Sequence, residues 1–150
     1  AGAPLPPGTT HVLNLTNAKT YAVPANVRML HFPIADDGHA APALMRAAPR
    51  LCAFIESARV DGGVCFCHCR AGISRSATVV LYYLMSVDAI KGSRVTAMSL
   101  AAGLAHLKSV RPMVSPNPGF MAALCQAETK LRGGEPSIDV ACYRQHCLGK

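Results

Sequence analysis

The chain has 150 residues, of which 51% are hydrophobic, which is enough for one domain with a single hydrophobic core. Lys and Arg outnumber Asp and Glu by 15 to 8, and the net charge of +7 favours phosphorylated or polyanionic partners. The basic residues are scattered rather than gathered in a run interleaved with aromatic residues, which argues against a nucleic-acid partner, and no apolar stretch is long enough for a membrane span.

The cysteines indicate the compartment. Their number, 7, is odd, and Cys65, Cys67 and Cys69 alternate along one apolar segment instead of forming the spaced pairs of a disulfide framework. Such thiols are typical of a reducing environment. We therefore expect a cytoplasmic protein, with the nucleus as the alternative.

Two short apolar segments near the start of the chain, His11–Leu15 and Val27–Phe32, are predicted to be strands. Residues 1–10, rich in Pro and Gly, are expected to form a lead before them. After the second strand, the run Asp36-Asp37-Gly38 predicts a turn.

From Leu44 the spacing of apolar residues becomes helical, and Gly62-Gly63 is predicted to end this helix. Pro49 is expected either to kink the helix or to begin its second part. The apolar residues with helical spacing are Leu51, Phe54, Ile55 and Ala58.

A third apolar run, Val64–His68, leads through residues 69–76 into the apolar stretch 77–85. This order predicts a strand, a loop and a buried helix.

Two further helices are predicted. The first starts at a Ser93 cap, includes Val95 and Met98, and ends at Arg111-Pro112. The second starts at an Asn117 cap, with Pro118 in its first turn, and ends at Gly133-Gly134, before a tail over residues 135–150.

Strands that alternate with helices predict an α/β fold, in which a central, mainly parallel sheet is flanked by helices on both faces. The folded domain is expected to span residues 11–134. In such folds the functional loops lie at the carboxyl ends of the strands.

The loop after the third strand is suited to bind phosphate. A loop between a strand and a helix N-terminus directs several backbone N–H groups at one point, and Gly72 permits its tight curvature. Cys69, at the first position, lies in the field of those donors, which favours a reactive thiolate. Arg75 can offer two parallel N–H donors to a phosphoryl group, as Lys cannot.

The segment from His68 to Ser76 reads His-Cys, five residues, Arg-Ser, and closely resembles the signature of the cysteine-dependent protein tyrosine and dual-specificity phosphatases. Further segments resemble family landmarks in family order: His11-Val12-Leu13-Asn14, Phe32-Pro33-Ile34-Ala35-Asp36, Phe54-Ile55, Tyr83-Leu84-Met85, Arg111-Pro112 and Pro116-Asn117-Pro118-Gly119-Phe120. The chain looks like a small atypical member, which implies the cysteine-phosphatase fold with a strand, phosphate loop and helix at the active site.

The resemblance also implies a mechanism. Cys69 attacks phosphorus to form a phosphocysteine, an aspartate protonates the leaving oxygen, and the same aspartate then assists water in hydrolysing the intermediate. Ser76 would hydrogen-bond the sulfur, and His68 would hold the surroundings of Cys69. No metal or cofactor is expected.

The expected substrate-binding residues form the phosphate loop, which Asn117 would brace and which phosphate or sulfate would occupy. They are Arg70, Ala71, Gly72, Ile73, Ser74 and Asn117.

Two aspartates are candidates for the acid. Position after the second strand favours Asp36, whereas counting back from Cys69 favours Asp37. The segment between Asp36 and Leu44 is a residue or two longer than in relatives, so one sequence does not fix the register. We expect Asp36 to be the acid.

The resemblance implies a shallow pocket, because no phosphotyrosine-clamping segment precedes the His11 strand, and such a pocket admits phosphotyrosine, phosphoserine and phosphothreonine in proteins. Arg70 is the one basic residue within the loop before Arg75, which disfavours a phosphoinositide phosphatase, and Ser76-Ala77 disfavours an RNA 5′-phosphatase. Both remain possible functions, together with that of a phosphopeptide-binding pseudo-phosphatase. The sequence defines neither the physiological substrate nor the oligomeric state.

The strand and helix that usually precede the His11 segment in the family are absent, so we expect either a shortened chain or a sheet that has lost an edge. Cys52, Cys65 and Cys67 are expected to fill the core, with a protective disulfide to Cys69 as the alternative. A zinc site formed by Cys65, Cys67, His68 and Cys69 is disfavoured, because zinc ligands prefer two-residue gaps.

Overall fold

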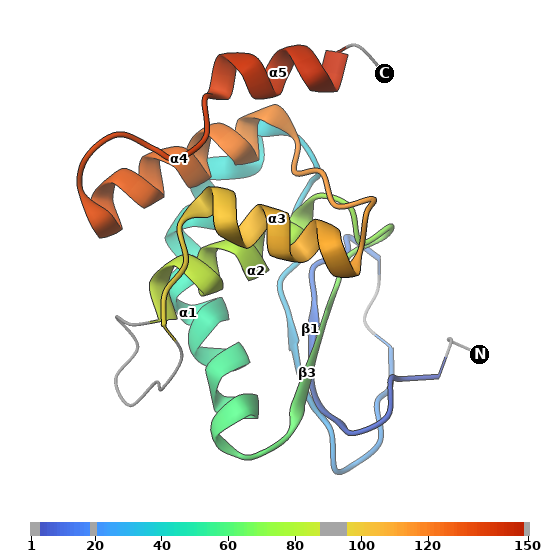
Figure 1. The fold of residues 1–150 in the computed structure, drawn as a ribbon. Coiled ribbons are helices and arrows are strands. Elements are labelled where there is room, and N and C mark those ends of the chain that lie inside the picture. The colour runs from blue at the N-terminus through green and yellow to red at the C-terminus, as the bar shows by residue number, and fades with distance from the viewer. Residues whose placement is uncertain (1–3, 19–20, 88–95, 149–150) are drawn as a thin grey trace.

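The computed structural model of the protein describes residues 4–18, 21–87 and 96–148. Three strands form one sheet: β1 (Thr9–Asn14), β2 (Arg28–His31) and β3 (Val64–His68). The helical elements, shown in Figure 1, are η1 (Gly38–Ala40), α1 (Ala41–Val60), α2 (Arg75–Ser86), α3 (Leu100–Val110), α4 (Pro118–Arg132) and α5 (Val140–Leu148).

The sheet is parallel and has the order β2-β1-β3, so the predicted α/β class and parallel sheet are confirmed. β1 is the central strand, and its Val12 pairs with Met29 on one side and Phe66 on the other. Because all three strands run the same way, their carboxyl ends meet at one edge of the sheet.

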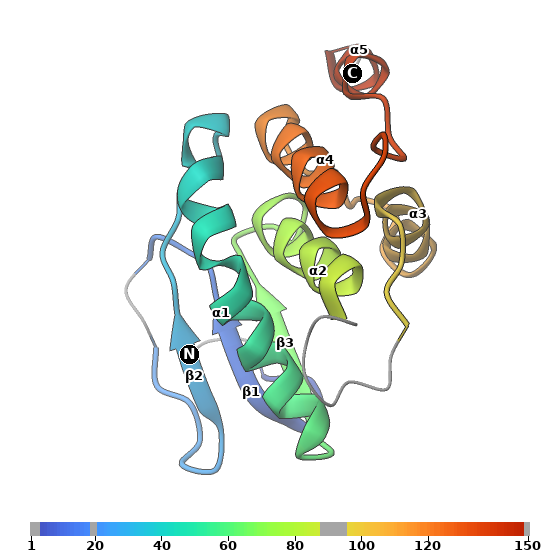
Figure 2. The same cartoon turned by 90° about the vertical axis from the view of Figure 1, so that its left-hand side faces the viewer.

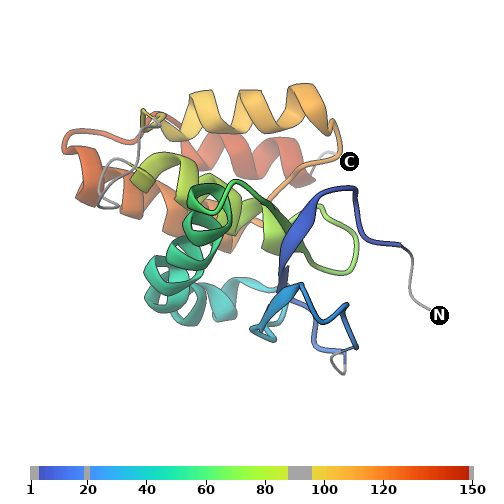
Figure 3. The same ribbon diagram turned by 90° about the horizontal axis from the view of Figure 1, so that it is seen from below.

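Helices α1 and α2 cover one face of this sheet (Figure 2). Leu13 of β1, Leu51 of α1 and Val79 of α2 belong to one buried apolar cluster, together with Cys69. Figure 3 shows the described helices gathered on this side of the sheet, whereas the sequence predicts helices on both faces. The parts of the chain that the structure describes place no helix on the opposite face.

Helix α1 is continuous through Pro49, which lies on its exposed side. Solvent there can hydrate the carbonyl that loses its N–H partner, so the helix need not begin again at the proline. It ends, as predicted, just before Gly62, whose φ of 70° suits glycine.

The predicted start of the helix that ends before Arg111-Pro112 is wrong. Helix α3 begins at Leu100, and Ser99 is its cap, with Oγ accepting the N–H of Ala102. Met98, expected inside the helix, instead donates its N–H to the carbonyl of Leu84 at the end of α2. The predicted Ser93 cap lies outside the described residues.

Helix α4 begins after Asn117 as predicted, whereas the expected tail at 135–150 contains α5. Tyr143 of α5 packs against the second apolar cluster, between α2, α3 and α4, and its hydroxyl donates to the Pro116 carbonyl at 2.8 Å. The domain boundaries stay predictions.

Buried Glu128 of α4 connects three segments. Its carboxylate accepts the N–H of Leu100 at 2.7 Å and the N–H of Ser137 at 2.8 Å, and the Ser137 hydroxyl donates to it as well. Burial alone would raise the pKa of Glu128, but these donors and nearby Arg132 outweigh it, so the pKa lies below its usual value of 4.5.

We predict that Glu128→Gln lowers the free energy of unfolding by about 1 to 3 kcal/mol. The NH₂ group of the new amide would face the N–H groups of Leu100 and Ser137, which are donors as well. Since the folded-state pKa is lowered, the carboxylate contributes stability above the unfolded-state pKa and loses it as the pH falls through the folded-state value. Urea denaturation at several pH values should therefore show that the free energies of unfolding of Glu128→Gln and wild type differ less at acidic pH than at neutral pH. Glu135→Gln, at an exposed acid of the neighbouring segment, is the control and should match wild type.

Candidate active site

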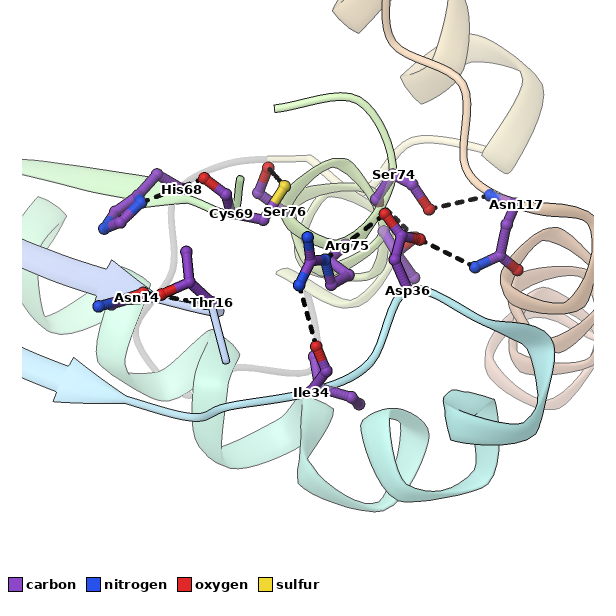
Figure 4. Close-up of polar contacts among 11 residues, drawn as sticks. Asn14, Thr16, Ile34, Asp36, His68, Cys69, Ser74, Arg75, Ser76 and Asn117 are labelled. Atoms are coloured by element: carbon purple, nitrogen blue, oxygen red, sulfur yellow. Dashed lines mark hydrogen bonds and ion pairs between the residues drawn. The ribbon is translucent and has the colours of Figure 1, made fainter. Parts of the chain in front are cut away.

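The phosphate loop runs from Cys69 at the end of β3 to Ser74 at the start of α2 (Figure 4). Gly72 has a φ of 67°, a left-handed conformation that L side chains rarely adopt, and this turns the chain sharply. The segment after β2 passes the same edge of the sheet. The loop and Asp36, which are far apart in sequence, therefore lie side by side.

Cys69 is buried, with 7% of its surface exposed, and its Sγ lies 3.3 Å from Ser76 Oγ. Burial opposes ionisation, but the Ser76 hydroxyl, the backbone N–H groups of Ser76 and Gly72, and the charge of Arg75 outweigh it and lower the pKa of the thiol. Cys69 thus ionises more readily than an ordinary thiol.

At the neighbouring thiols burial is the larger effect. Burial raises the pKa of Cys52 to about 12 and that of Cys65 to about 11, and it raises the pKa of Cys67 well above the usual value. Cys65 and Cys67 pack in the same apolar cluster as Cys69, in agreement with their predicted role in the core. No sulfur–sulfur bond joins the described cysteines.

Arg75 folds back toward the segment after β2. Its Nη1 donates to the Ile34 carbonyl at 3.1 Å, and its Nε lies 3.5 Å from Asp36 Oδ2. This Nε is buried and has no hydrogen-bond partner among the described residues. A donor held in that way at the phosphate loop could bind an oxygen of a phosphoryl group.

The two candidate acids have different surroundings. Asp36 forms an ion pair with Arg75 and accepts a hydrogen bond from Asn117 Nδ2 at 3.1 Å. Asp37 is the cap of η1, and its Oδ1 accepts the N–H of Ala40 at 3.0 Å. The structure therefore brings Asp36 to the loop and places Asp37 in a helix cap.

The His68 ring lies beside the loop, with Nδ1 3.4 Å from the carbonyl oxygen of Cys69. Its Nε2 lies 2.9 Å from the Tyr21 hydroxyl, and Phe66 stacks on it at a centroid distance of 5.1 Å. Burial lowers its pKa, which favours the neutral ring.

Asn117 contacts the phosphate loop, as expected from the resemblance. Its backbone N–H donates to Ser74 Oγ at 3.0 Å, and the Ser115 N–H donates to the Ile73 carbonyl at 2.9 Å. Arg70 and Ala71 are exposed at the surface of the loop.

Arg111, which the sequence indicated only as a helix end and family landmark, also contacts the phosphate loop. Its Nε donates to the Gly72 carbonyl at 3.0 Å and its Nη2 to the Ala71 carbonyl at 2.9 Å. A Cβ at Gly72 would lie 2.8 Å from Arg111 Nη2, so the contact also requires glycine. By holding two carbonyls outward, Arg111 stabilises the loop curvature that turns N–H groups inward.

In the described ranges, no group of three or more His, Cys, Asp or Glu side chains is arranged to hold a metal ion. None of the helices described is both long and apolar enough to cross a membrane.

Comparison with known proteins identifies the class. Residues 7–130 match the family model described as the dual specificity phosphatase catalytic domain. Human dual specificity phosphatase 28 is 34% identical over 137 residues, which cover 87% of this chain and 72% of that protein. Rat dual specificity protein phosphatase 15 is 45% identical over 71 residues, which cover 47% of this chain and 27% of that protein.

Solved structures agree. The crystal structure of human dual specificity phosphatase 28 superposes with a TM-score of 0.70 at 34% identity, covering 83% of this chain and 80% of that one. A mouse dual specificity phosphatase crystallised with zinc tungstate has a TM-score of 0.69 at 35% identity, covering 83% and 72%. The chain belongs to the dual specificity phosphatase family and is a cysteine-dependent protein phosphatase.

We predict that Ser76→Ala raises the pKa of Cys69, because the Ser76 hydroxyl is the largest of the effects that lower it. The rate of alkylation of Cys69 by iodoacetamide, followed by peptide mass spectrometry, should reach half its maximum at a higher pH than in wild type. Ser86→Ala removes a hydroxyl at the other end of α2 and should leave the curve unchanged. Identical curves for Ser76→Ala and wild type would show that the hydroxyl does not stabilise the thiolate.

Proposed function

We propose that the protein hydrolyses phosphotyrosine, phosphoserine and phosphothreonine in proteins through a phosphocysteine at Cys69. The observation that carries the proposal is the convergence on one loop of a thiol with lowered pKa, the buried Arg75 guanidinium and the Asp36 carboxyl. Membership of the dual specificity phosphatase family supports the broad choice of phosphorylated side chains.

In the first step, the Cys69 thiolate attacks phosphorus as the bond from phosphorus to the leaving oxygen breaks. Asp36 donates its proton to that oxygen, so a neutral hydroxyl leaves. In the second step, Asp36 takes a proton from water as the water attacks the phosphocysteine. The Cys69 sulfur leaves as a thiolate, which the Ser76 hydroxyl at 3.3 Å stabilises.

The phosphoryl oxygens would be bound by Arg75 and by the backbone N–H groups of residues 70–75. These donors are fixed before the reaction and stabilise charge as it develops in the transition state. The mouse relative was crystallised with tungstate, a tetrahedral oxyanion like phosphate, which supports binding of phosphate or sulfate here.

Phosphoproteins fit this loop better than polyphosphorylated lipids or RNA. Ala71, Ile73 and Ser74 are neutral. Apart from Arg75, the exposed Arg70 is therefore the one positively charged side chain of the loop that could bind an additional phosphate. A free thiolate also requires a reducing environment, which supports a cytoplasmic or nuclear location.

We predict that Asp36→Ala lowers kcat for phenyl phosphate about a hundredfold or more, because the leaving oxygen then lacks its proton donor. Asp37→Ala should change kcat only severalfold and lower the free energy of unfolding by about 1 kcal/mol, because it removes a helix cap. Steady-state kinetics and urea denaturation measure the two effects. The reverse order of activities would make Asp37 the acid.

Cys69→Ser and vanadate test the nucleophile and the loop in the same assay. Cys69→Ser should abolish turnover, and vanadate should inhibit wild type reversibly. If wild type binds phosphopeptides without turnover, the protein is a phosphopeptide-binding pseudo-phosphatase. Faster hydrolysis of phosphoinositides than of phosphopeptides would make it a lipid phosphatase, and faster hydrolysis of 5′-phosphorylated RNA would make it an RNA 5′-phosphatase.

A further inference from the structure

The outer side of the phosphate loop is held by hydrogen bonds to three consecutive carbonyl groups. Arg111 donates to the carbonyls of Ala71 and Gly72, and the backbone N–H of Ser115 donates to that of Ile73 at 2.9 Å. The peptide bonds of the loop are trans, and a trans peptide unit points its C=O and its N–H in opposite directions. Each carbonyl held outward therefore turns the N–H of the following residue toward the inside of the loop.

The contact at Ile73 concerns a different N–H group from those that act on the Cys69 sulfur. The carbonyl of Ile73 shares its peptide unit with the N–H of Ser74, so the contact sets the direction of that N–H. The backbone donors to the sulfur are instead the N–H groups of Gly72 and Ser76. The contact at Ile73 is therefore expected to affect the binding of phosphoryl oxygens rather than the ionisation of the thiol.

The Tyr143 hydroxyl fixes the segment that makes this contact. It donates to the carbonyl of buried Pro116 at 2.8 Å and lies 3.3 Å from Ser115 Oγ. The Pro116 carbonyl shares its peptide unit with the N–H of Asn117, which donates to Ser74 Oγ at 3.0 Å. Because a peptide unit is planar, a hydrogen bond to its carbonyl on one side sets the direction of its N–H on the other. One hydroxyl thus orients two neighbouring N–H groups that hold the loop.

Helix α5, which carries Tyr143, is itself fixed to the rest of the domain and lies beside α4 (Figure 1). Asp139 Oδ1 accepts the N–H of Ala141 at 2.7 Å and so caps the first turn of α5. Val140 and Tyr143 are three residues apart on one face of the helix, and both pack against the apolar cluster between α2, α3 and α4. The ring packing and the cap therefore hold the Tyr143 hydroxyl in place at the Pro116 carbonyl.

We propose that Tyr143 is a positioning residue for the phosphate loop, holding Ile73 and Ser74 through Ser115 and Pro116 in the shape that binds a phosphoryl group. The inference rests on the proposed function, in which this loop binds the phosphoryl group of the substrate. Tyr143 does not touch the reacting atoms, so its effect on rate passes through the loop. It lies beyond residues 7–130, which match the family model, and so adds a part of the chain outside that model to the site.

The test is Tyr143→Phe, which keeps the aromatic ring for the apolar cluster and removes only the hydroxyl. The affinity for tungstate, a tetrahedral oxyanion, is measured by isothermal titration calorimetry on the whole chain, and kcat/KM is measured with phenyl phosphate. Both should fall by a similar factor, about fivefold, which is the effect of losing one hydrogen bond. The N–H of Ser115 should also exchange with D2O faster than in wild type, as followed by NMR, because its hydrogen bond to Ile73 is loosened.

Two further variants separate positioning from a general loss of structure. The pH dependence of Cys69 alkylation by iodoacetamide should be the same in Tyr143→Phe and wild type, because the donors to the sulfur are held elsewhere. Arg111→Met should weaken tungstate binding and also move alkylation to higher pH, because Arg111 holds the carbonyl opposite the Gly72 N–H. Tyr82→Phe, at a partly buried tyrosine that packs against the same apolar cluster, is the matched control and should leave all these measurements unchanged.

The outcomes distinguish this inference from the proposed function. Wild-type affinity for tungstate in Tyr143→Phe would overturn the positioning role and leave the proposed function intact. Weaker binding together with a shifted alkylation curve would indicate a general loss of loop structure and would overturn it as well. If wild type binds tungstate but does not hydrolyse phenyl phosphate, the proposed function fails, while weaker tungstate binding by Tyr143→Phe with an unchanged alkylation curve still supports the inference. If wild type does not bind tungstate, both fail.

Discussion

The hydrogen bonds and the positive charge around the buried Cys69 sulfur, which lower the pKa of its thiol, are the interactions on which the rest of the site depends. Burial by itself raises the pKa of a thiol, as it does for Cys52 and Cys65. Around Cys69 this effect of burial is outweighed, because the Ser76 hydroxyl and two backbone N–H groups hydrogen-bond the sulfur and the charge of Arg75 acts on it. Such an arrangement requires a tightly curved loop, which the left-handed Gly72 permits and Arg111 holds from outside.

The parallel sheet explains how an acid from a distant part of the chain reaches this loop. β2 and β3 flank β1 and end at the same edge, so the segment that follows β2 passes the loop that follows β3. The start of α4 then closes the site, because Asn117 contacts both segments and Gly119 packs against Gly38. Helices α2 and α4 thus place their N-termini at the site and pack their apolar faces in the core.

Membership of the dual specificity phosphatase family rests on the catalytic domain as a whole. The family model covers residues 7–130, and the structural similarity to human dual specificity phosphatase 28 extends over most of both chains. Helix α5 lies beyond the matched residues, yet Tyr143 and Glu128 join this region to the core. Its packing shows that the folded part of the chain extends past the family model.

The sequence by itself determined the three strands and the loop between β3 and α2, and it predicted Cys69 as the nucleophile, because each of these depends on residues close together in the chain. The loop motif from His68 to Ser76 and the Asn117-Pro118 cap are local signals of this kind. Only the tertiary structure separated Asp36 from Asp37, since their difference is contact with Arg75 and Asn117, which are distant in sequence. For the same reason it alone revealed the role of Arg111, the late start of α3 and the packing of α5. The spacing of residues along the chain does not indicate such contacts, because they form only when separate elements pack together in the folded protein.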